Sequence, residues 1–119
     1  MKERLKTIIH KNTEILVLDY SDLKESEMIK LITAAKELIA RENKKVVVLS
    51  ILNRKNYISP KFMRTAERQI REVEHLIVKN SITGISEVQG WLVKGINLWH
   101  KSRLHVFDSV DNALDFLVA

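Results

Sequence analysis

Acidic side chains stand at places where α/β proteins often hold ligands. Asp19 and Asp22 follow one apolar run that is typical of a strand, and Asp108 follows another. Ligands in α/β folds bind outside the carboxyl ends of strands, so these carboxylates are candidates for binding. Capping and turn formation explain all three equally well. No acid–base pair accompanies them, so they do not indicate a catalytic site.

Residue types that bind metals and cofactors are sparse. The chain has no cysteine, which removes disulfides, thiol catalysis and cysteine-ligated zinc. No two histidines are three or four residues apart, the spacing that places two metal ligands on one helix face. No glycine-rich phosphate loop occurs. We therefore expect no catalytic residues, no metal and no cofactor.

Cations gather on one side of the helix expected after a Ser-Pro pair: Lys61, Arg64, Arg68 and Arg71. Such a stripe could face phosphates of nucleic acid or lipid headgroups. Glu67 and Glu72 dilute its charge, and no aromatic side chains alternate with the cations to stack on bases. We expect a solvated helix face and no nucleic-acid partner.

The most broadly apolar helix is expected over residues 86–100. Its inward stripe comprises Ile85, Val88, Leu92, Ile96 and Trp99. A second stripe, Trp91, Gly95 and Leu98, is offset by about 100°. Such a helix is either wedged between other elements or exposes a patch that binds a partner or forms a homodimer. Both interpretations of Trp91 stay open.

Length and composition are ordinary for one globular domain over residues 1–119, with 45% hydrophobic and 29% charged residues. The start, Met-Lys-Glu-Arg-Leu-Lys, leads into no apolar signal segment, and no run approaches the roughly 18 residues of a transmembrane segment. With the absence of cysteine, this favours the cytoplasm. The net charge of +5 is modest and scattered, as in mildly basic bacterial proteins.

Apolar runs alternate with amphipathic segments along the chain. Residues 6–10 and 14–20 flank a polar turn and predict a β-hairpin. Further strands are expected at 46–52, 75–82 and 103–107. Helices are expected at 24–41, capped by residues 21–22, then from Pro60 through Val73, over 86–100, and after Ser109.

This order, β-β-α-β-α-β-α-β-α, predicts the α/β class. We expect a mostly parallel five-stranded sheet whose first strand is antiparallel, because strand–helix–strand units are joined by right-handed crossovers. Residues 15–18 and 46–49 are apolar at every position. Strands of this kind are buried on both faces, so something must cover each side of the sheet.

Four segments, residues 14–21, 57–63, 81–85 and 106–117, resemble the STAS-like domains, the group that includes the anti-sigma-factor antagonists. The chain is similar to small bacterial proteins of STAS or CRAL-TRIO lipid-transfer-like type over nearly its whole length. The resemblance implies a four-turn βα superhelix with its helices on one face of the sheet. Chain ends, a partner or a second copy would then cover the other face.

The resemblance also implies a role for Ser59. In anti-sigma-factor antagonists, a serine at the corresponding helix start is phosphorylated by a partner kinase. A phosphate there would meet free backbone N–H groups and the helix dipole, and the nearby Arg54, Lys55 and Lys61 could add charge. The loop departs from the antagonist pattern, because it lacks the acidic-serine-glycine signature. The alternative is that Ser59 only caps its helix.

The sequence thus favours a non-enzymatic regulatory or protein-interaction module of STAS-like type. Its partner or ligand loop would comprise Asn53, Arg54, Lys55, Tyr57 and Lys61. The partner of such a module would be another protein. The alternative is a carrier that holds a small molecule or a lipid between its helices and its sheet.

Overall fold

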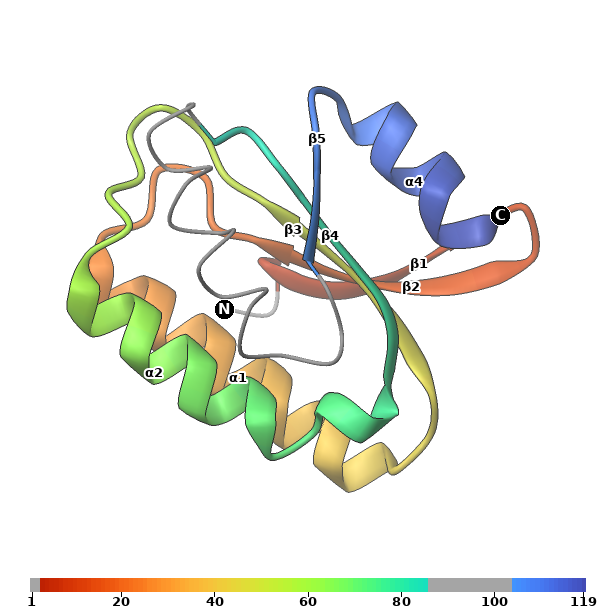
Figure 1. The fold of residues 1–119 in the computed structure, drawn as a ribbon, viewed down its shortest axis with the longest axis horizontal. Coiled ribbons are helices and arrows are strands. Elements are labelled where there is room, and N and C mark those ends of the chain that lie inside the picture. Colours follow the sequence, from red (N-terminus) through yellow and green to blue (C-terminus); the bar gives the residue numbers. More distant parts are fainter. Residues whose placement is uncertain (1–2, 86–103) are drawn as a thin grey trace.

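The computed structural model describes residues 3–85 and 104–119 (Figure 1). Its elements are β1 (Leu5–His10), β2 (Thr13–Asp19), α1 (Glu25–Glu42), β3 (Val46–Ile51), α2 (Pro60–Arg71), the 3-10 turn η1 (Glu74–Leu76), β4 (Ile77–Thr83), β5 (Leu104–Phe107) and α4 (Val110–Val118). The α/β class is confirmed. The helix expected over residues 86–100, with its patch of Trp91, Gly95 and Leu98, lies outside the described residues.

The five strands form one sheet in the order β1-β2-β3-β4-β5. β1 is antiparallel to β2, and every later pair is parallel, as the sequence predicts. Successive right-handed crossovers that advance in one direction place their helices on one face. Accordingly, α1 and α2 lie side by side on the same side of the sheet (Figure 1).

Strand β2 is buried on both faces. Leu16 and Leu18 belong to the core under α1 and α2, whereas Ile15 and Val17 pack in a second core with Leu49 of β3. Helix α4 completes that second core and lies across the sheet from α1 and α2 (Figure 1). Among the described helices, α4 is therefore the exception to an arrangement with all helices on one face. The carboxyl-terminal part of the chain is what covers the second face of these strands.

Polar contacts hold α4 at its carboxyl end and at the β1–β2 hairpin. Nζ of Lys79 donates to the carbonyl oxygens of Phe116 (3.0 Å) and Ala119 (2.8 Å). At the hairpin, Oδ1 of Asp115 lies 3.4 Å from Nζ of Lys11 and 3.5 Å from Nε2 of His10. These contacts lower the pKa of Asp115, chiefly through the hydrogen bond with His10. The Lys79 and Asp115 contacts orient α4, and the apolar residues of the helix provide its buried surface.

The start of α1 and the passage from α2 into β4 differ from the prediction. Helix α1 is capped by Lys24, whose N–H donates to Oε1 of Glu27 (3.2 Å), and not by residues 21–22, which belong to the loop before it. Helix α2 ends at Arg71, and residues 74–76, expected partly as strand, form η1. A tight turn is needed there because the chain reverses from α2 into β4 within a few residues.

Leu117 tests the contribution of α4 to stability, because its side chain is 3% exposed. We expect Leu117→Ala to lower the free energy of unfolding by about 2–5 kcal/mol, through lost burial and a residual cavity. Val110→Ala is the control on the same helix, since Val110 is 38% exposed and its truncation should cost less than about 1 kcal/mol. Urea unfolding followed by circular dichroism measures both. Equal losses would contradict the covering role of α4.

Candidate functional site

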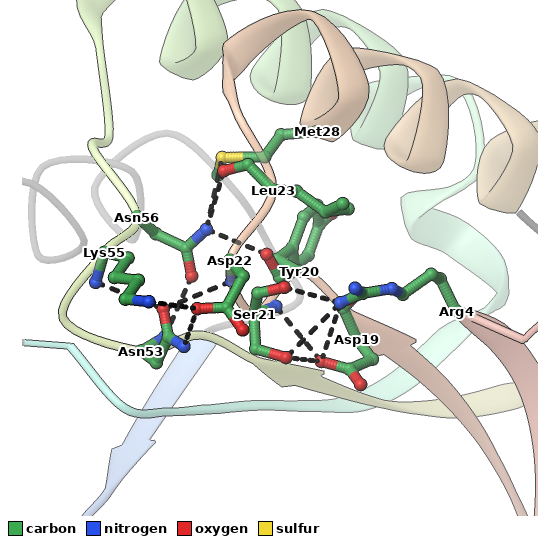
Figure 2. A network of polar contacts seen from close by, with 10 residues as sticks. All are labelled: Arg4, Asp19, Tyr20, Ser21, Asp22, Leu23, Met28, Asn53, Lys55 and Asn56. Atoms are coloured by element: carbon green, nitrogen blue, oxygen red, sulfur yellow. Dashed lines mark hydrogen bonds and ion pairs between the residues drawn. The ribbon is translucent and has the colours of Figure 1, made fainter.

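Polar residues gather where the parallel strands β2 and β3 end. Figure 2 shows the network, which joins the loop after β2, residues 20–24, to the loop after β3, residues 52–59. Parallel strands end at the same edge of a sheet, so these loops meet although about 30 residues separate their contacts. This edge is the candidate functional site.

A single buried amide, that of Asn56, holds the two loops together. Its Nδ2 donates to the carbonyl oxygens of Tyr20 (2.8 Å) and Leu23 (3.0 Å), and its Oδ1 accepts from the N–H of Asn53 (2.8 Å). The residue is 3% exposed, so water cannot replace these partners. Buried polar groups left unpaired are costly, which makes Asn56 a structural clamp.

Asn53 adds a second connection between the loops. Its Nδ2 donates to Oδ1 of Asp22 (2.8 Å), and its Oδ1 accepts from the N–H groups of Lys55 (3.1 Å) and Asp22 (3.3 Å). Asp22 has φ of 65°, a left-handed conformation that aspartate tolerates in turns. The Asp22 carboxylate thus shapes a turn.

Asp19, the other candidate ligand at this edge, contacts its own neighbours. Its Oδ1 accepts from Oγ (2.6 Å) and N–H (3.0 Å) of Ser21 and lies 3.7 Å from the Arg4 guanidinium. The same guanidinium donates to the carbonyl oxygen of Ser21. Both acidic residues at this edge therefore serve loop structure. The third, Asp108, is exposed after β5.

Ser59 caps α2 as the sequence predicts. Its Oγ accepts from the N–H of Phe62 (3.0 Å) and donates to Oε2 of Glu25 in the first turn of α1. The residue is 5% exposed. A phosphate on Ser59 would meet the Glu25 carboxylate, so modification would first require this hydrogen bond to break. The geometry favours the capping role, and phosphorylation of Ser59 stays a prediction.

The remaining residues of the predicted partner loop are exposed to solvent. Tyr57 is 71% exposed although its neighbours Asn56 and Ile58 are 3% and 5% exposed. Arg54, Lys55 and Lys61 are also exposed. The Tyr57 ring is therefore held in solvent between two buried neighbours, in a loop that also carries exposed cations.

Tyr20 belongs to the hydrophobic core next to this site. Its ring packs edge-on against Phe62, with centroids 5.7 Å apart. Burial raises the pKa of the Tyr20 hydroxyl well above its usual range, so the side chain stays neutral at physiological pH. Tyr20 acts as a core residue here.

A backbone contact fixes the start of the 52–59 loop. The N–H of Leu52 donates to the carbonyl oxygen of Thr83 (2.9 Å). The next residue, Gly84, has φ of 82°, and a Cβ built on it would lie 1.7 Å from the Leu52 carbonyl oxygen. Only glycine fits this approach.

A separate groove of about 580 Å³ opens at the amino ends of β2 and β3. Its apolar lining includes Leu16, Leu38, Ile39 and Val46, and its charged lining includes Glu14, Glu42, Lys44 and Lys45. Nζ of Lys44 lies 3.3 Å from Glu14 and 3.5 Å from Glu42, and these carboxylates raise the pKa of Lys44. The opposite charges thus partly neutralise one another beside the apolar residues that line the groove. No periodic sequence signal marks this groove.

Other kinds of site find no support in residues 3–85 and 104–119. No three histidine or acidic side chains converge there as a metal site would require. No helix in these ranges is long and apolar enough to cross a bilayer. On the basic stripe of α2, Arg71 pairs with Glu67 at 2.7 Å, four residues earlier on the helix.

No family model matches the sequence, and no curated protein is detectably similar to it. A solved structure is similar: an uncharacterized protein of the DUF3478 family from Shewanella loihica PV-4, described as having a SpoIIAA-like fold. The two superpose with a TM-score of 0.71 over 95% of this chain and 91% of that chain, at 15% sequence identity. The fold is SpoIIAA-like. The STAS-like architecture predicted from the sequence is thereby confirmed.

The contribution of Asn56 to this site is directly testable. We expect Asn56→Ala to lower the free energy of unfolding by about 2–3 kcal/mol, because two carbonyl oxygens lose their buried donor. Asn112→Ala, at an exposed position of α4, is the matched control and should change stability by less than about 0.5 kcal/mol. Chemical denaturation of both variants gives the comparison. A small effect at Asn56 would refute its role as a clamp.

Proposed function

We propose that this chain is a non-enzymatic regulatory module that binds another protein through the loop after β3. The observation that carries the proposal is the exposure of Tyr57, at 71%, between two residues that are almost fully buried. Arg54, Lys55 and Lys61, all within four residues of it in the sequence, are exposed cations. We call these four residues the recognition surface. The SpoIIAA-like fold supports a regulatory role by analogy.

The physics of binding favours such a surface. Tyrosine and arginine are enriched among the few residues that dominate interface energies, because they combine large contact area with directed hydrogen bonds. A loop held by Asn56 and by the Ser59 cap loses little conformational entropy on binding. The matching partner is a protein that offers an apolar pocket for the ring and acidic groups around it.

The partner loop can be tested by site-specific photocrosslinking in native cells. With a photoreactive phenylalanine derivative in place of Tyr57, we expect one dominant crosslinked protein. The control carries the same group in place of Val110, at an exposed position of α4. Once that protein is identified, Tyr57→Ala should weaken its binding about thirtyfold, equivalent to about 2 kcal/mol. Identical crosslinks at both positions would contradict the proposal.

A second candidate function is the transport of a small molecule or lipid. The groove at the amino ends of β2 and β3 supports it, since about 580 Å³ is within the usual size of ligand pockets. Because its charged residues occur in both signs, a neutral or zwitterionic amphiphile is the matching ligand.

Native mass spectrometry of the purified protein tests this candidate. We expect a retained ligand that is lost in Leu38→Gln, which alters the groove, and kept in Leu114→Gln, a half-buried position on α4. A wild-type protein that retains no ligand and gains no thermal stability from neutral amphiphiles would exclude the carrier role.

A further inference from the structure

Strand β1 forms an edge of the sheet. Within residues 3–85 and 104–119 it is the first strand in the order β1-β2-β3-β4-β5 and pairs with β2 alone. One row of its backbone N–H and C=O groups therefore faces away from the sheet. Unpaired rows of this kind are templates for another strand.

The register identifies the outward groups. The N–H of Asp19 donates to the carbonyl oxygen of Arg4 (2.8 Å), which makes these two residues a hydrogen-bonded pair. Along an antiparallel ladder such pairs alternate with open ones. Lys6 and Ile8 therefore bond to β2, whereas Leu5, Thr7 and Ile9 direct their N–H and C=O groups outward.

The side chains on this edge are mostly uncharged. Ile9 is 73% exposed, the largest exposed fraction among the large apolar side chains of the described residues, and Thr7 is exposed as well. Lys6 is the only lysine, arginine or acidic residue in the strand. Natural edge strands are usually protected by several charges, prolines or bulges, and β1 has few such devices.

We propose that a second copy of this chain pairs with β1 in antiparallel orientation, around a two-fold axis at Thr7, so that two sheets become one. In this register Leu5 faces Ile9 of the second copy, and Thr7 faces its own counterpart. Each outward N–H and C=O group then meets a complementary group. This homodimer goes beyond the proposed protein partner of the recognition surface, which lies at the carboxyl ends of β2 and β3.

Self-complementarity favours a second copy over an unrelated peptide. Apolar side chains face apolar ones, and threonine pairs across strands are themselves favourable. A register centred on Lys6 would instead place two ammonium groups face to face. These pairings favour the register centred on Thr7 over the one centred on Lys6.

The expected dimer is weak. Pairing of two six-residue strands buries less surface than a standard protein interface. The two Lys6 side chains lie diagonally across the axis and repel each other, and salt screens this repulsion. We therefore expect a dissociation constant in the micromolar to millimolar range that falls as ionic strength rises.

Charge substitutions at the axis test the register. Sedimentation equilibrium of the full chain should show a monomer–dimer equilibrium. Thr7→Lys and Thr7→Glu should each weaken it at least about tenfold, because like charges then face each other. An equimolar mixture of the two variants should restore dimers. Val106→Lys, on the exposed face of the other edge strand, is the control and should dimerise like the wild type.

Hydrogen exchange gives a measurement that needs no substitution. In the dimer the amides of Leu5, Thr7 and Ile9 become protected as protein concentration rises, whereas those of Lys6 and Ile8 are protected at every concentration. A wild type that stays monomeric throughout would overturn the proposal. So would a dimer that tolerates both Thr7 substitutions, a mixture that does not restore pairing, or a dimer lost in Val106→Lys.

Discussion

Strand β2 imposes the constraint from which the rest of the architecture follows. Because side chains alternate between faces, the unbroken apolar run Ile15–Leu18 requires water to be excluded from both sides of the sheet. Right-handed crossovers that advance in one direction place α1 and α2 on a single side. The other side of β2 is covered by α4, which follows the last strand.

The candidate site is a consequence of the same parallel architecture. Strands that end together bring their following loops together, and the backbone groups of those loops need partners. Asn56, Asn53 and Asp19 satisfy them, so these polar side chains already have bonding partners within the chain. Tyr57 and the cations beside it remain directed toward solvent. The polar groups within the site therefore bond to one another, and the proposed recognition surface is what the site presents to solvent.

Local signals in the sequence predict local structure well. Apolar runs locate the strands, the Ser59-Pro60 pair locates the start of α2, and strand order follows from the connections. Periodicity marks Ala113 and Leu117 of α4 as buried, and it also marks Val110, which is exposed. It does not show which sheet face receives the helix, since that depends on the whole topology. The clamp at Asn56 leaves no signal because one asparagine in a polar loop looks like any other. Its burial depends on the distant carbonyl groups of Tyr20 and Leu23.

The position of α4 in the chain also determines when the second face of the sheet can be covered. Strands β1 to β5 are adjacent in the sheet in the order in which they leave the ribosome, so pairing can proceed strand by strand without long-range rearrangement. The helix that covers Ile15, Val17 and Leu49 is made after all of them. The apolar residues that α4 covers therefore stay exposed until this helix docks on the sheet. That interval is when chaperones would recognise the chain and when it is most prone to aggregate.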